Sequence, residues 1–85
     1  MINFSDNMPT ILLINGYRFY FYAGDWNEPA HVHVEKGEGV AKIWLEPSLS
    51  PKYFEGFKAK EKKEILKLAT ENHELLKTKW YEFFR

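Results

Sequence analysis

The sequence contains no cysteine, and this absence excludes two kinds of chemistry. Without thiols the chain can form neither a disulfide framework nor a thiolate metal site, and nothing in it requires an oxidising compartment. A metal ion would therefore need histidine and carboxylate ligands.

Long apolar runs are also missing. No stretch approaches the roughly 20 apolar residues of a membrane span. The N-terminal segment "MINFSDNMPTILLING" lacks the basic region and long apolar run of a secretory signal. We therefore expect a cytoplasmic protein without a membrane partner.

An excess of charge of one sign is missing too. Twelve Lys and Arg residues balance twelve Asp and Glu residues, and a net charge of zero argues against a strongly electrostatic nucleic-acid binder. The charges are unevenly spread, because residues 1–57 hold four basic and seven acidic residues while residues 58–85 hold eight and five. The basic half is the C-terminal segment.

The chain does contain enough apolar material for one core. Hydrophobic residues make up 45% of the sequence and aromatic residues 18%, which are globular values. A chain of 85 residues suffices for one domain and not for two. We expect a flexible N-terminal extension over residues 1–7 and a single domain over residues 8–85.

Four β-strands are predicted in the first half of the chain. Residues 10–14 and 17–22 are β-type runs joined by an Asn-Gly pair, which favours a two-residue hairpin turn. Residues 31–36 and 40–45, joined by a glycine-containing turn, form a second hairpin. The segment 46–57 has two prolines, two serines and a glycine, and we interpret it as a connection.

The second half is helical. Apolar side chains recur at helical spacing at Ile65, Leu68, Ala69, Leu75, Leu76, Trp80 and Phe83. We predict one long C-terminal helix that bends or breaks near Asn72-His73. The fold class is then α+β, a four-stranded antiparallel sheet of two hairpins with one long or bent C-terminal helix packed on one face.

Alternation along the strands separates two chemically different sheet faces. Val32 and Val34 point to one side, and His31, His33 and Glu35 point to the other. If the helix covers the apolar side, the opposite face collects aromatic and titratable groups: Arg18, Tyr20, Tyr22, His31, His33, Glu35, Lys42 and Trp44. This assignment is a hypothesis, since a slip of one residue would exchange the two faces of a strand.

One use of this face is metal binding by His31, His33 and Glu35. Their spacing sets successive side chains about 6.6 Å apart on one side of a strand, and imidazole and carboxylate suit zinc, nickel or iron. A complete site needs further ligands, for which Asp25, Glu28 and His73 are available. The sequence places none of these three.

A second use is acid–base catalysis. His31 or His33 would move a proton while Arg18 or Lys42 stabilises a developing anion, as in metal-free RNA cleavage. No nucleophile motif or phosphate-binding glycine loop supports another enzyme class. If the protein is an enzyme, we therefore expect a ribonuclease-like hydrolase with His31, His33 and Arg18 as catalytic residues.

A third use is binding without catalysis. Bases or side chains of a partner would stack on Tyr20, Tyr22 and Trp44, with Glu35 and Lys42 on the same face. The plain alternative is that the histidines are ordinary strand residues packed beside tyrosines.

The C-terminus carries an aromatic cluster, Trp80, Phe83 and Phe84, which must be covered by the core or by a second copy. A structural, dimerising domain is therefore a further alternative.

Four segments form a specific combination over residues 8–84. They are "MPTI" at 8–11, "GYRFYFY" at 16–22, "EPAHVHVEKGEGVAKIWLEP" at 28–47 and "FKAKEKKEILKLATENHELLKTKWYEFF" at 57–84. In them the chain resembles a small bacterial family known as domain of unknown function 4160 (DUF4160). It departs from the family pattern at Pro29-Ala30, where many members have two prolines, and at Asn27, near which others carry a histidine.

The resemblance implies a partner, because family members are often encoded beside a second small protein in toxin–antitoxin-like gene pairs. It implies, less directly, an action on RNA or translation. We therefore expect a small component of a two-protein, toxin–antitoxin-like module that acts through the His31/His33 face on a protein partner or RNA. We expect no cofactor, with a divalent metal as the alternative.

Overall fold

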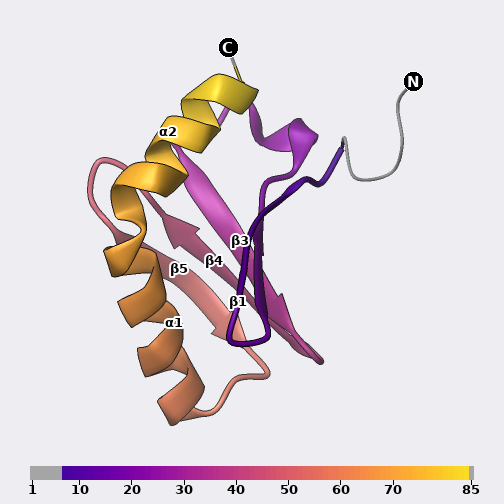
Figure 1. Cartoon of the computed structure of the whole chain (residues 1–85), viewed down its shortest axis with the longest axis vertical. Helices are drawn as coiled ribbons and strands as arrows, with labels where there is room; N and C mark the ends of the chain where they lie inside the picture. Colours follow the sequence, from indigo (N-terminus) through magenta and orange to yellow (C-terminus); the bar gives the residue numbers. More distant parts are fainter. Residues whose placement is uncertain (1–6, 85) are drawn as a thin grey trace.

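Five antiparallel strands and two helices make up the fold in the computed structural model, which describes residues 7–84 (Figure 1). The strands are β1 (Thr10–Ile14), β2 (Tyr17–Tyr20), β3 (His31–Lys36), β4 (Gly39–Trp44) and β5 (Ser50–Glu55), and they pair in sequence order. A 3-10 turn, η2 (Ala23–Asp25), precedes β3, and α1 (Ala59–Glu71) and α2 (His73–Phe83) follow β5. The predicted α+β class is confirmed.

The extension expected over residues 1–7 lies, apart from Asn7, outside the described residues. Within the described part of the chain, no helix has the length and apolar character to cross a membrane.

The prediction of four strands is wrong, because the segment interpreted as a connection contains β5. In this strand Phe54 pairs with Ala41 of β4, and Tyr53 pairs with Lys42. Proline is tolerated at position 51 because β5 is an edge strand and because the register shifts beside its partner Ile43, two settings in which a missing N–H is accommodated. The proline and serine content therefore marked an edge strand.

The predicted single helix, long or bent, is wrong in number, since the segment forms two helices separated by a break. The chain leaves helical geometry at Asn72, whose φ is −112° and ψ 17°. Its side-chain amide donates to the carbonyl oxygen of Leu68 at 2.8 Å, which is the competition with backbone bonding that makes asparagine a poor helix-interior residue. The break thus falls at the predicted Asn72-His73 position.

The core lies between the helices and one face of the sheet (Figure 1). Val32 and Val34 of β3 are fully buried there, together with Ile43 of β4, Ile65 of α1 and Leu76 of α2. Val32 and Val34 therefore face the core as the alternation predicts, while His31, on the other side of β3, is also fully buried.

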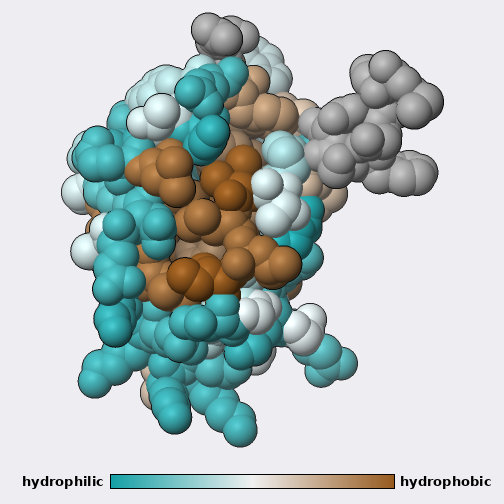
Figure 2. Space-filling model, in the orientation of Figure 1, coloured by the Kyte–Doolittle hydropathy of each residue, from teal (hydrophilic) through white to brown (hydrophobic). Residues whose placement is uncertain are grey.

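The helices do not cover the β1 side of the sheet completely. In Figure 2 apolar side chains gather in the middle of the view, between the helices and β1. The β1 residues Leu12 and Ile14 pair with Phe19 and Tyr17 and are only half-buried. Leu13 points to the other side and is 73% exposed. Among residues 7–84, β1 is thus a partly exposed, mostly apolar and uncharged edge of the sheet.

Candidate functional site

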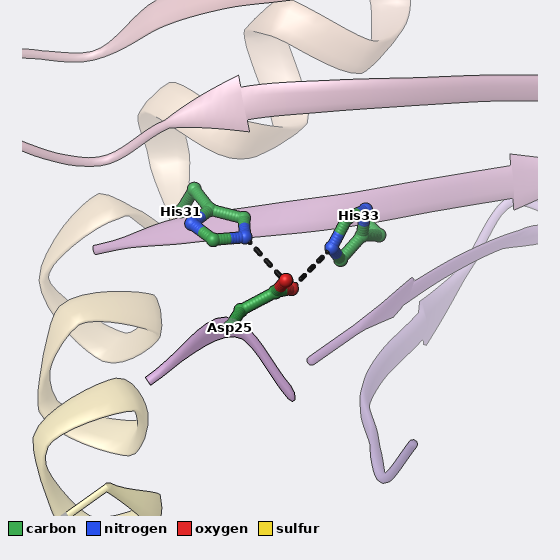
Figure 3. Close-up of side chains that lie close together, drawn as sticks. All are labelled: Asp25, His31 and His33. Carbon is green, nitrogen blue, oxygen red and sulfur yellow. Dashed lines mark hydrogen bonds and ion pairs between the residues drawn. The ribbon is translucent and has the colours of Figure 1, made fainter. Parts of the chain in front are cut away.

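Three side chains from two adjoining segments, Asp25, His31 and His33, meet on the side of β3 opposite Val32 and Val34 (Figure 3). His31 and His33 alternate along β3, so both rings leave the same face. Asp25 reaches them from η2, where its N–H donates to the Tyr22 carbonyl oxygen at 2.9 Å and its own carbonyl oxygen accepts from Glu28 at 3.1 Å. These turn bonds carry the loop back over the start of β3.

One carboxylate oxygen joins the two rings. Oδ2 of Asp25 lies 2.8 Å from Nε2 of His31 and 2.7 Å from Nε2 of His33. The three donor atoms all lie within 4.8 Å of one another, which is close enough for a single metal ion. His31 is fully buried, while the side chains of Asp25 and His33 are 13% and 18% exposed, so solvent reaches the cluster from one side.

The hydrogen bonds of His31 define which ring nitrogen carries a proton. Nδ1 lies 2.9 Å from the carbonyl oxygen of Pro29, and a carbonyl oxygen only accepts, so Nδ1–H is the donor. In the neutral ring Nε2 then carries a lone pair that faces the carboxylate oxygen of Asp25. This contact requires either a second proton on the ring or a cation shared by both atoms. Metal-binding histidines typically have this backbone bond on their other nitrogen.

Asp25 is held in its ionised form. Burial raises the pKa of its carboxyl group, but the hydrogen bonds from His33 and His31 outweigh burial, and the net pKa lies below the ordinary value. An anionic carboxylate is the form that ligates a metal.

Glu35, expected as the third ligand, lies apart from this cluster. Its carboxylate pairs with Nη1 of Arg18 at 3.0 Å. Arg18 also donates from Nε to Oγ1 of Thr10 at 2.7 Å and from Nη2 to the carbonyl oxygen of Met8. Its guanidinium is therefore held at every nitrogen by an acceptor of the chain itself.

Lys42 lies directly opposite His33 in the β3–β4 register. Its Nζ forms an ion pair with Glu28 and sits 4.7 Å from the centre of the Trp44 ring. Trp44 in turn meets the His31 ring edge-on, with 5.5 Å between ring centres. Lys42 and Trp44 thus join the histidines in one group.

The remaining predicted binding residues are tyrosines with different surroundings. Tyr20 is nearly buried and stacks on His33, with 5.3 Å between ring centres. Tyr22 is 47% exposed just before η2. Gly24 allows this ring to approach closely, since a Cβ there would lie 2.5 Å from it.

Of the C-terminal aromatic cluster, Trp80 is buried within the chain, whereas Phe83 and Phe84 are half-buried. Trp80 is 4% exposed and packs on Phe21 and His31, with ring centres 5.4 and 5.0 Å apart. The centre of the Phe84 ring lies 4.1 Å from the centre of the Trp80 ring. His73, another candidate ligand, donates to the Leu45 carbonyl oxygen at 2.7 Å, away from the cluster.

The positions of two residues at this site, Asp25 and Trp26, were not predicted from the sequence. Asp25 was one of three available ligands, but its position depends on the path of the loop. Trp26 follows Asp25 directly and is 72% exposed, an unusual state for so large an apolar side chain. A strand with alternating histidines after a short loop is the available signal for Asp25, but this loop carries two acidic residues, Asp25 and Glu28, and the sequence does not distinguish them.

Comparisons with known proteins support one assignment. A family model described as "Domain of unknown function (DUF4160)" matches residues 16–81, which is more than half of the chain and includes all three residues of the cluster. No curated protein and no solved structure matches the chain. The chain therefore belongs to the DUF4160 family.

Proposed function

We propose that Asp25, His31 and His33 bind a divalent metal ion, and that the protein uses this centre to hydrolyse RNA. The observation that carries the proposal is the set of three donor atoms within 4.8 Å of one another. The backbone bond at Nδ1 of His31 adds to it, because it leaves Nε2 as the ligating nitrogen of the neutral ring.

Two imidazoles and one carboxylate suit zinc, iron, nickel or manganese and leave coordination positions open. A metal in such a site supplies a Lewis acid and activates water for attack on a phosphodiester. The chain's own contribution is to hold the three donors in place, with His31 fixed by burial and by the Pro29 carbonyl oxygen.

The paired charges and the exposed aromatic side chains of this face support the proposal that RNA binding depends on the metal. The basic side chains of the face are paired, Arg18 with Glu35 and Lys42 with Glu28, so the face has no excess cation of its own. A divalent ion would supply that charge. Exposed Trp26 and Tyr22 flank Asp25 in sequence and offer rings on which single-stranded bases can stack.

We also propose that the protein is the acting component of a two-protein, toxin–antitoxin-like module with a small protein partner. The family resemblance is the basis of this part. The uncharged β1 edge and the apolar side chains beside it in Figure 2 provide a surface for such a partner.

The test combines metal binding with RNA cleavage. Calorimetry with Zn²⁺, Mn²⁺, Ni²⁺ and Fe²⁺ should give one site per chain in the wild type and none in Asp25→Asn or His33→Ala. Glu35→Gln is the matched control, since it removes a carboxylate from the same strand face outside the cluster. Single-stranded RNA should be cleaved only by the metal-loaded wild type and control.

Two results would contradict the proposal in different ways. Cleavage that persists in EDTA and disappears in His33→Ala would indicate a metal-free ribonuclease. Metal binding without cleavage of any RNA would leave a binding or structural centre.

A further inference from the structure

Arg18 and Lys42, two cations on the sheet face opposite the core, differ in how many acceptors of the chain hold them, three for Arg18 and one for Lys42. Arg18 uses Nε, Nη1 and Nη2 for Thr10, Glu35 and the Met8 carbonyl oxygen. Lys42 has one acceptor among residues 7–84, the carboxylate of Glu28. An ammonium group carries three N–H donors, so two of them remain for a ligand.

Lys42 lies where its two remaining N–H donors are near the proposed metal ligands. Lys42 and His33 are directly opposite on neighbouring strands, where side chains on one face lie about 5 Å apart at Cβ. Its Nζ lies over the Trp44 ring, and that ring contacts His31. Lys42 is thus the cross-strand neighbour of His33, and its ammonium group lies over a ring that contacts His31.

Partial burial of Lys42 strengthens the ionic hydrogen bonds that its ammonium group can form. Its side chain is only 14% exposed, and in such surroundings an ionic hydrogen bond is less weakened by water than at an open surface. Glu28 is 36% exposed and lies in the loop that carries Asp25. Glu28 therefore keeps the ammonium group beside the site before an anion arrives.

We infer that Lys42 binds the phosphate group of the substrate by donating from Nζ to a non-bridging phosphate oxygen at the Asp25, His31 and His33 centre. This inference rests on the proposed function and names the residue that recognises the anionic group of the substrate. Arg18, although it is on the same face, takes no part in that contact.

Inorganic phosphate is the probe that tests this role apart from catalysis. Wild type, Lys42→Gln, Lys42→Arg and Arg18→Gln are first titrated with Zn²⁺, and the zinc-loaded proteins are then titrated with phosphate by calorimetry. Lys42→Gln should keep its zinc affinity and bind phosphate roughly tenfold or more weakly, as expected for the loss of one ionic hydrogen bond. Lys42→Arg should retain most of the phosphate affinity because it keeps the charge, and Arg18→Gln should match the wild type.

The outcomes separate this inference from the proposed function. Equal phosphate affinity in Lys42→Gln and wild type, or no phosphate binding by the zinc-loaded wild type, overturns the role of Lys42 while the metal centre stands. Absence of zinc binding by the wild type, with the other metals also inactive, overturns both.

Discussion

The two faces of the sheet are built on different principles. The helix-covered face holds Val32, Val34, Ile43 and other apolar side chains at zero exposure. The opposite face holds ion pairs, stacked rings and one fully buried histidine, on which Trp80 of α2 packs. Stability therefore depends mainly on the first face, and the proposed chemistry on the second, so substitutions on the two faces should have separable effects.

The largest expected effect is on the covered face. Ile43→Ala should lower the free energy of unfolding by about 2–5 kcal/mol, through lost transfer free energy and a cavity. Urea denaturation followed by circular dichroism measures this change. Leu13→Ala, at a side chain 73% exposed, is the control and should stay within about 0.5 kcal/mol. Equal losses in both variants would show that burial does not distinguish these positions.

Metal addition should stabilise the protein through the opposite face of the sheet, which holds Asp25, His31 and His33. At a free metal concentration 100 times the dissociation constant, wild-type stability should rise by about 2.7 kcal/mol or less. Thermal unfolding with and without metal, followed by removal with EDTA, measures the gain. Asp25→Asn should show none. A rise of the same size in Asp25→Asn would place the metal elsewhere.

The two histidines should separate stability from metal binding. Both His31→Ala and His33→Ala should abolish metal binding, because each removes a donor atom. His31→Ala should also destabilise the apoprotein by about 1–3 kcal/mol, since its buried ring packs on Trp80 and bonds two acceptors. His33→Ala should cost about 1 kcal/mol or less. Denaturation of both apoproteins measures these losses of stability. A larger loss in His33→Ala than in His31→Ala would contradict the expectation from burial.

The smallest effect concerns an ionisable group on the covered face. Burial, with added effects of the hydrogen bond and charge of Glu64 and the charge of Glu61, raises the pKa of Tyr17 from 10.0 to about 12. The folded state thus holds this proton more tightly than the unfolded state, and the resulting stability is present below pH 10 and lost as pH rises toward 12. Tyr17→Phe should show a shallower loss of stability between these pH values in denaturant titrations. Identical slopes would show that the proton is released equally in both states.

Local sequence patterns predicted much of the difference between the two sheet faces. The alternation of Val32 and Val34 with His31 and His33 gave the two faces of β3, and the Asn-Gly pair gave the first hairpin, with φ of 53° at Asn15 and 82° at Gly16. These features depend on residues near in sequence, so periodicity and turn chemistry are enough to find them.

The features that were missed depend on tertiary position. Pro51 is compatible with a strand only at the edge of a sheet, and no local pattern shows where the edge is. Asp25 becomes a neighbour of both histidines only because η2 turns the loop over β3. Glu35, on the predicted side of β3, is instead paired with Arg18 from β2.

The local origin of the three ligands has a kinetic consequence. Asp25 is six residues from His31 and eight from His33, so bringing them together costs little loop-closure entropy. By contrast, the hydrogen bond between Tyr17 and Glu64 spans 47 residues. In the metal-bound protein that we propose, the ion can be captured by this short segment before the sheet and helices assemble. Metal should then speed folding more than it slows unfolding, because its contacts would already exist in the transition state.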